Sequence, residues 1–302
     1  SNTLQVRVED AVGNTGVART QAYVLDTTAP TVTVSLVGGA DNTVSSQTGD
    51  ANVVGAAEAN STVTIKTGAT TLGTASTDAS GNFVYTLTAG NITTLGQGND
   101  SITITQTDTA GNIGTSNTYT FRVDTIAPSA PVFALGTGVS GGATSTEATQ
   151  GSGVVTLTAE SGAAVSVTFT NGANTVTKSL TGTGASQAVT LTSADLTTLG
   201  NGTISVSASA TDSAGNTSTL GNSSFTLDTI APSTPVAPTV IANISSGISA
   251  SEATSGFSVT TSLAGTNALA GDTIKLVING GTTNLSATLS ASDITNGTYT
   301  FT

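Results

Sequence analysis

Four residue types are missing from this 302-residue sequence: cysteine, histidine, methionine and tryptophan. Without cysteine the chain forms no disulfides, and without cysteine or histidine it has no metal site built on those ligands. The same absences exclude cysteine nucleophiles and Ser-His-Asp triads. The acidic residues follow a repeat and leave no separate carboxylate pair of the glycosidase type. We therefore expect the protein not to be an enzyme.

Positive charge is also scarce, with 6 Lys and Arg residues against 18 Asp and Glu and a net charge of −12. Nucleic-acid binding needs clustered Lys and Arg, so this class of partner is excluded. Anionic lipid would repel the chain, and no apolar run approaches the ~20 residues of a membrane span. We expect no membrane insertion, and cations are the natural small partners of such a chain.

A pair of motifs occurs three times along the chain. The first motif, Asp-x-x-Gly-Asn, begins at Asp10, Asp108 and Asp212, and the second, Asp-Thr-x-Ala-Pro, begins sixteen residues later, at Asp26, Asp124 and Asp228. The copies of the first motif are 98 and 104 residues apart. This period is too long for a solenoid and suits a β-sandwich domain of about 100 residues.

Alternating apolar residues precede each first motif. Residues 202–212 read GTISVSASATD, with Ile204, Val206, Ala208 and Ala210 in one phase. The same phase gives Ile102 and Ile104 in the second copy and Leu4, Val6 and Val8 in the first. A period of two predicts strands with one buried face. An aromatic residue lies three positions before each second-motif Asp (Tyr23, Phe121 and Phe225), and we interpret these aromatics as core residues.

The repeat divides the chain into four parts. Residues 27–124 and 125–228 are predicted to be complete units of about seven strands, with short helical turns at 89–98 and 193–202. Residues 1–26 correspond to the last two strands of a unit. Residues 229–302 correspond to a unit truncated before its final strands, and its last strand, NGTYTFT, is interpreted as the one that leads to the next first motif.

The segments TAESGAAVSV, TDSAGN and DTIAPSTP resemble the tandem bacterial Ig-like repeats of large surface adhesins, including biofilm-associated and type I-secreted ones. The resemblance covers both complete and both partial units. It implies an all-β fold of tandem Ig-like β-sandwiches arranged as an elongated rod. It also implies an extracellular location on the bacterial cell surface, and calcium between the domains.

Topology suggests a purpose for the repeated aspartates. In an Ig-like sandwich the last hairpin turn and an early turn lie at the end where the chain enters, and the last strand leaves at the opposite end. Asp124 should therefore meet Glu160 and Asp212 at one joint, and Asp26 should meet Glu58 and Asp108 at the other. Three carboxylates repel one another unless a cation lies between them, and Ca²⁺ takes roughly six to eight oxygen ligands.

The third unit departs from this pattern, since Asp272 stands where the other units have a Glu in the early turn. Asp228 and Asp272 complete the set of candidate calcium ligands. Each motif also has a purely structural interpretation. Asp-x-x-Gly-Asn is common in hairpin turns where Gly or Asn takes a positive φ, and Asp-Thr-x-Ala-Pro ends a strand because Pro cannot donate to a sheet.

The leading functional hypothesis is a stalk segment of an extracellular adhesin, stiffened by calcium at its joints and extending a distal module towards an unknown target. Its partners are then neighbouring repeats of the same chain. The alternative is a subunit of an extracellular filament or surface layer, in which other copies of the chain complete the partial units by strand addition. A sugar- or ice-binding module is less favoured, because aromatic residues are only 4% of the chain and most occupy predicted inward positions.

Overall fold

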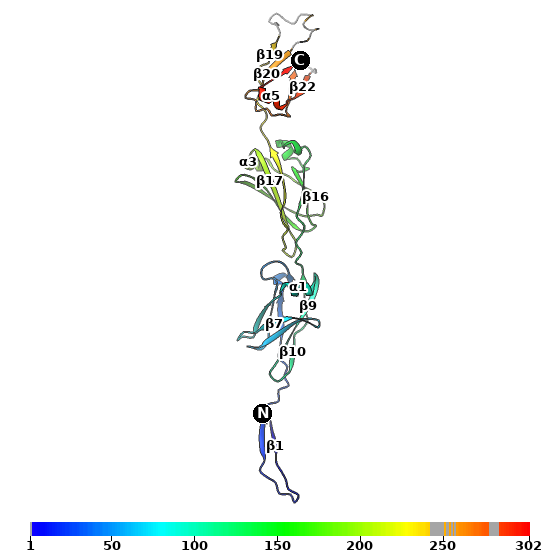
Figure 1. Cartoon of the computed structure of the whole chain (residues 1–302), viewed down its shortest axis with the longest axis vertical. Coiled ribbons are helices and arrows are strands. Elements are labelled where there is room, and N and C mark those ends of the chain that lie inside the picture. The colour runs from blue at the N-terminus through cyan, green and yellow to red at the C-terminus, as the bar shows by residue number, and fades with distance from the viewer. Residues whose placement is uncertain (1, 242–250, 252–253, 255, 257, 278–283) are drawn as a thin grey trace. The chain divides into compact units, whose positions relative to one another are not determined.

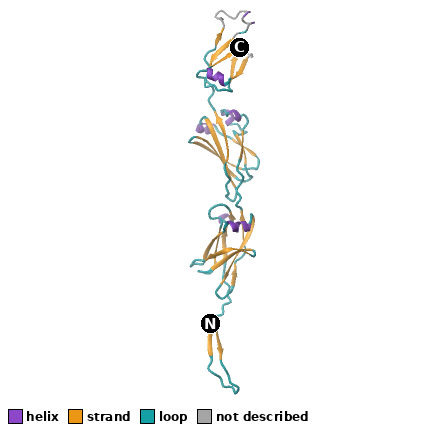
Figure 2. Cartoon of the chain, in the orientation of Figure 1, coloured by secondary structure: helices purple, strands orange, loops and turns teal. Residues whose placement is uncertain are grey.

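The computed structural model describes residues 2–241, 251, 254, 256, 258–277 and 284–302. The chain divides into two compact units, Ser1–Leu227 and Asp228–Thr302, which are treated separately below. Strands dominate both units, and the helices are short (Figure 2). None of the helices in the described part of the chain is long and apolar enough to cross a membrane.

The strands between residues 33 and 123 form a sandwich of two sheets, referred to below as the first domain (Figure 1). One sheet has the order β3-β5-β8, with β3 at Thr33–Val37, β5 at Asn52–Ala56 and β8 at Asn82–Thr86. The other has the order β4-β11-β9-β6-β7, formed by Thr43–Val44, Tyr119–Val123, Gly98–Thr107, Thr62–Thr67 and Thr70–Ser76, and β10 (Ile113–Thr115) also pairs with β9. Only the β4–β11 pair among these is parallel. This is an immunoglobulin-like strand order.

The strands between residues 132 and 227 repeat the arrangement and form what is referred to below as the second domain. One sheet has the order β12-β13-β16, formed by Val132–Leu135, Val155–Thr158 and Ser186–Val189. The other has the order β15-β14-β17-β18, formed by Asn174–Thr181, Ala164–Asn171, Gly202–Thr211 and Gly221–Leu227. The predicted fold class, an all-β chain of Ig-like sandwiches, is confirmed.

Both predicted helical turns are present, as α1 (Ala89–Leu95) and α3 (Ser193–Leu199). Each begins with a capping box: in α3 the Thr192 hydroxyl accepts a hydrogen bond from the Asp195 backbone, and the Asp195 carboxylate accepts one from the Thr192 backbone. Such reciprocal bonds satisfy two backbone donors that a helix start leaves free. The other short helical elements of residues 27–227 are η1 (Gly39–Asp41), η2 (Val139–Gly141) and α2 (Ser145–Ala148).

The alternating residues form the core as the sequence predicts. Ile204 and its three apolar companions on β17 are at most 1% exposed. Phe121 and Phe225 are buried, and Phe225 meets Phe169 edge to face, with 6.4 Å between the ring centroids. Such aromatic pairs add to the stabilisation that burial alone provides. The interpretation of these two aromatics as core residues is confirmed.

The second compact unit, Asp228–Thr302, is referred to below as the third domain, and the core of its described residues is smaller. Its sheets have the orders β19-β20-β23 and β21-β22, formed by Thr239–Ile241, Ser258–Ser262 and Thr298–Phe301, and by Thr273–Val277 and Asn284–Thr288, with α5 at Ala291–Asn296. β23 pairs with β20 as β8 pairs with β5. The strand NGTYTFT is therefore the counterpart of β8, and its interpretation as the strand that leads into a first motif was wrong.

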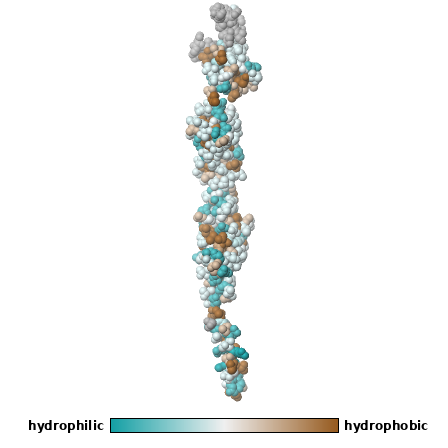
Figure 3. Space-filling model, turned by 90° about the vertical axis from the view of Figure 1, so that its left-hand side faces the viewer, coloured by the Kyte–Doolittle hydropathy of each residue, from teal (hydrophilic) through white to brown (hydrophobic). Residues whose placement is uncertain are grey.

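Residues 2–23 form a two-stranded hairpin of β1 (Asn2–Val6) and β2 (Arg19–Tyr23), referred to below as the N-terminal hairpin. The predicted inward residues Leu4, Val6 and Val8 are 60%, 70% and 77% exposed, and Tyr23 is 41% exposed. The expectation of a buried face was wrong here, because no second sheet in the described part of the chain lies against these two strands. Figure 3 shows hydrophobic residues at the surface of this hairpin.

The two domains in residues 27–228 have separate cores, which gives a first test. Leu157 is fully buried in the second core, so Leu157→Ala should destabilise the second domain by about 2–5 kcal/mol through lost burial and a residual cavity. Amide hydrogen exchange should accelerate throughout residues 125–227 and stay unchanged in residues 27–123. Leu220→Ala is the matched control, since Leu220 is 59% exposed. Equal effects of the two substitutions would contradict this assignment of the core.

Candidate functional site

The first motif is a tight turn organised by its aspartate. One carboxylate oxygen of Asp212 accepts hydrogen bonds from the backbone N–H groups of Ala214 and Asn216, both at 2.9 Å. The other oxygen accepts a bond from the Asn216 side-chain amide, also at 2.9 Å. Asp10 and Asp108 bind Asn14 and Asn112 in the same way. The glycine takes the positive φ in each copy, so the backbone of the turn does not require the asparagine, and the contribution of that residue is its side chain.

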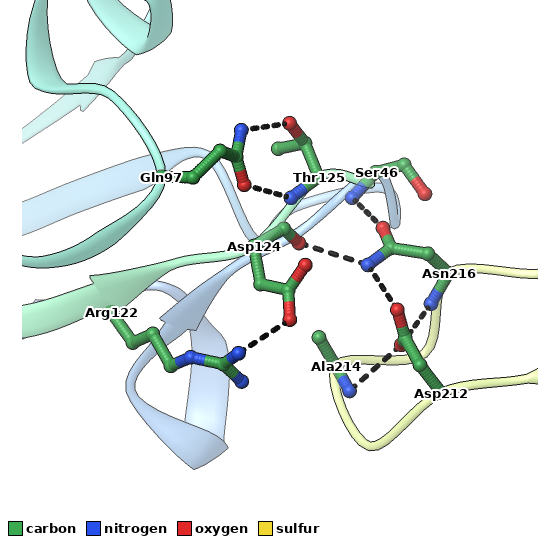
Figure 4. A network of polar contacts seen from close by, with 8 residues as sticks. All are labelled: Ser46, Gln97, Arg122, Asp124, Thr125, Asp212, Ala214 and Asn216. Carbon is green, nitrogen blue, oxygen red and sulfur yellow. Dashed lines mark hydrogen bonds and ion pairs between the residues drawn. The ribbon is translucent and has the colours of Figure 1, made fainter. Parts of the chain in front are cut away.

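Asn216 connects this turn to the first domain. Its Nδ2 donates to the backbone carbonyl of Asp124 at 2.9 Å, and its Oδ1 accepts from the backbone N–H of Ser46 at 2.9 Å (Figure 4). The side chain is fully buried, with 0% of its surface exposed. A single amide therefore ties the last hairpin turn of one domain to the last strand and an early loop of the preceding domain.

Two glutamines support the same joint. The Gln47 side chain donates to the carbonyl of Ala214 at 3.3 Å, which adds a further bond between the early loop and the turn. Gln97 binds the linker residue Thr125 twice, donating to its hydroxyl at 2.8 Å and accepting from its backbone N–H at 3.0 Å. The residue that follows the second-motif aspartate is thus held against the domain that the chain is leaving (Figure 4).

The carboxylate of Asp124 already has a positive neighbour. Arg122 Nη2 lies 2.8 Å from Asp124 Oδ2, and the side chains are 49% and 17% exposed respectively. The other two copies of the second motif have Val24 and Thr226 at the arginine position. Since the pair is partly open to solvent, its direct contribution to stability is small, about 0–1 kcal/mol. Its larger consequence is that a cation at this carboxylate would compete with Arg122.

The joint before the first domain repeats the amide contact in weaker form. Asn112 Nδ2 donates to the carbonyl of Asp26 at 3.2 Å. The Asp26 carboxylate accepts a bond from the backbone N–H of Thr28 at 3.0 Å and has no arginine two residues before it. The Asn112 side chain, with the local backbone N–H groups, holds the pKa of the Asp108 carboxyl below its ordinary value. Asp108 is therefore ionised at neutral pH.

The remaining candidate ligands lie in separate local contacts. Glu58 accepts a bond from the Gln106 side chain at 2.7 Å, within the first domain. Glu160 is exposed in the turn before β14, where its backbone carbonyl accepts from Ala163. Asp228 accepts from the backbone N–H of Ile230 at 3.0 Å, and Asp272 accepts from that of Leu269 at 2.8 Å.

The structure thus connects Asp124 with Asp212, and Asp26 with Asp108, through asparagine amides. It does not gather three carboxylates: among the described residues no three Asp or Glu side chains come together in a group that could hold a metal ion. The available donors are carboxylate and carbonyl oxygens, which suit calcium chemically. At the second joint Arg122 already neutralises Asp124, whereas the first joint has Val24 at the arginine position.

Asn216 and Arg122 were not identified from the sequence as functional residues. The recurring Gly-Asn in all three first motifs was a usable signal for Asn216, but a turn explained it equally well. Arg122 occurs in only one copy of the second motif and carried no repeat signal. Asp78 forms a similar turn within the first domain, where its carboxylate accepts hydrogen bonds from the backbone N–H groups of Ser80 and Asn82.

No protein-family model matches the chain, and no curated protein matches it. Solved structures similar to it include a Ca²⁺-stabilised adhesin that helps an Antarctic bacterium to bind ice, at 26% identity and a TM-score of 0.45, covering 99% of this chain and 72% of that one. A 1.5-MDa bacterial ice-binding adhesin matches at 22% identity and a TM-score of 0.37, over 90% of this chain and 85% of that one. A tetra-tandem repeat from the extending region of a large adhesion protein matches at 22% identity and a TM-score of 0.29, over 99% and 72%. At these TM-scores the likenesses assign neither a family nor a function.

Proposed function

We propose that this chain is a structural stalk segment of an extracellular bacterial adhesin, in which tandem Ig-like domains are joined as a rod. The observation that carries the proposal is the Asn216 amide, which binds the last hairpin turn of the second domain to the end of the first. The assignment to adhesins follows the motifs that resemble tandem bacterial Ig-like repeats. No catalytic role is proposed.

The joint resists bending because several polar groups must separate together. Asn216, Gln47 and Gln97 supply bonds to the first domain, the second domain and the linker. A typical hydrogen bond contributes a net of about 0.5–1.5 kcal/mol, and a buried amide that loses a partner costs more. Since Asn216 is fully buried, a bent joint leaves its amide unsatisfied or admits water to it.

Calcium is proposed to add to this hydrogen-bonded joint. At the first joint the candidate ligands are Asp26, Glu58 and Asp108, and at the second they are Asp124, Glu160 and Asp212. Asp228 and Asp272 are the corresponding candidates in the third domain. Bound calcium would supply a positive charge that draws carboxylates of adjoining domains together. At the second joint the ion would have to displace Arg122 from the Asp124 carboxylate or share that carboxylate with it, so we expect weaker binding there.

A filament or surface-layer subunit assembled by strand addition between chains is the second candidate. The observation that favours it is the apolar face of the N-terminal hairpin, where Leu4, Val6 and Val8 are exposed. This candidate does not depend on calcium or on the Asn216 contacts.

The stalk proposal predicts that Asn216→Ala loosens the joint between the first and second domains. The Ser46 N–H loses its acceptor, so its hydrogen exchange should accelerate by roughly fivefold or more, equivalent to about 1 kcal/mol. Residual dipolar couplings should show the two domains reorienting independently while each keeps its fold. Asn222→Ala is the control, because Asn222 is exposed and donates only within the second domain. Unchanged Ser46 exchange in Asn216→Ala would count against the joint.

The calcium proposal predicts that Asp26→Asn removes one ion from the stoichiometry measured by isothermal titration of the full chain, because it neutralises a ligand of the first joint. Asp195→Asn is the control, since the Asp195 carboxylate accepts hydrogen bonds from Thr192 and Lys178 within the second domain and is not a candidate ligand. The proposal is wrong at this joint if Asp26→Asn binds as many ions as the unaltered chain, with equal affinity.

A separate prediction concerns the arginine. Arg122→Gln removes the charge that competes for Asp124, so calcium affinity at the second joint should rise by up to about fivefold, the equivalent of the ~1 kcal/mol that a partly exposed ion pair contributes at most. Arg19→Gln makes the same change in charge on the N-terminal hairpin and should leave that affinity unchanged. Identical titration curves for the two variants would argue that no cation binds near Asp124.

A further inference from the structure

The chain enters and leaves the first domain at opposite ends of β9. Asn112, in the turn that follows β9, donates a side-chain hydrogen bond to the carbonyl of Asp26, where the chain enters. Gly98, the first residue of β9, pairs with Val123 at the end of β11, where the chain leaves. β9 has 10 residues, so these two points lie about 30 Å apart. Tension along a stalk therefore pulls the two ends of the domain apart along its strands.

The pair formed by β4 and β11 lies in the path of this tension. β4 belongs to the N-terminal part of the domain, β11 is its last strand, and the two run parallel. Tension draws β4 back towards the entry and β11 out at the exit, so the two strands are loaded in shear. Because the hydrogen bonds between them run across the direction of the pull, they must break together and not one after another.

Backbone and side-chain hydrogen bonds both fasten this pair. The backbone N–H groups of Arg122 and Asp124 donate to the carbonyls of Asn42 and Val44, at 3.0 and 2.8 Å. Asn42 caps the end of η1 with a φ of 64°, and its Nδ2 donates to the carbonyl of Thr120 at 2.9 Å. Asn42 therefore binds the last strand through its backbone and through its side chain.

The second domain has a weaker form of this pair. Within residues 125–227 the counterpart of β4 is an isolated parallel bridge between Ala143 and Leu227, whereas β4 and β11 share two residue pairs. Gly142 caps η2 as Asn42 caps η1, and a glycine cannot form the side-chain bond. The first strand is held equally in both domains, since β3 with β5 and β12 with β13 each share four residue pairs.

We propose that β4, β11 and the Asn42 amide form a force-bearing clamp, and that tension unfolds the second domain before the first. The inference rests on the stalk function proposed above, because a stalk carries tension between its ends. Unfolding a domain of about 100 residues releases up to roughly 330 Å of extended chain. The second domain is then the extensible element of the stalk, and the first domain stays folded at the same load.

The pairing of the last strand opposes this order. β18 pairs with β17 over seven residue pairs, whereas β11 pairs with β9 over five. The load passes in series through the N-terminal segment of a domain and through its last strand, so the weaker of these two attachments fails first. In the second domain the weaker attachment is that of the N-terminal segment, which the additional pairs between β17 and β18 do not hold.

Single-molecule force spectroscopy of the full chain, held at its two ends, tests the order of unfolding. The first and second domains each release about 100 residues, which distinguishes their events from that of the shorter Asp228–Thr302 unit. Leu157→Ala identifies the second domain, because Leu157 is fully buried in its core. We expect this substitution to lower the force of the weaker of the two events and to leave the stronger one unchanged. A shift of the stronger event would overturn the proposal.

Asn42→Gly tests the side chain itself. Glycine adopts a positive φ readily, so the substitution removes the amide without straining the backbone. The unfolding rate of the first domain at a fixed force should rise by roughly three- to tenfold, as expected for one lost hydrogen bond. Asn60→Gly is the matched control, because Asn60 is exposed in the same domain, has a φ of 54° and precedes β6, away from the clamp.

Equal unfolding rates in Asn42→Gly and Asn60→Gly would show that the Asn42 amide bears no load, against the proposal. Either failure leaves the hydrogen-exchange test at Ser46 and the calcium titrations unaffected, because those concern the joints and not the strands within a domain. Loss of the stalk function is therefore distinguishable from loss of the clamp.

Discussion

The arrangement of the first and second domains depends on one buried side-chain amide. Asn216 has two donors and one acceptor in use, and they are satisfied by the Asp212 carboxylate, the Asp124 carbonyl and the Ser46 N–H. A buried amide with all partners present rigidifies its surroundings, and one with a partner missing is costly. The contact therefore favours a single arrangement of turn, strand end and loop over a range of bent ones.

This dependence explains why a chain with few charges keeps its paired aspartates. The Asp212 carboxylate accepts hydrogen bonds from three N–H groups of the turn. These bonds fix the conformation of the turn and orient the Asn216 side-chain amide. Asp124 offers its backbone carbonyl to that amide, while its carboxylate is left to Arg122. Neither role requires a metal ion. Under the calcium proposal the ion would be an additional cross-link, expected more readily at Asp26, which has Val24 in place of the arginine two residues before Asp124.

Sequence periodicity predicted the strands, the two complete sandwiches and most of the core, because alternation of Ile204 with polar residues depends only on local geometry. It could not predict whether a second sheet is present, which is why Leu4 and Val6 are exposed although their pattern is that of buried residues. The roles of Asn216 and Arg122 could not be predicted from sequence periodicity either. Asn216 contacts Asp124 across 92 positions and Ser46 across 170, so its role belongs to two domains at once.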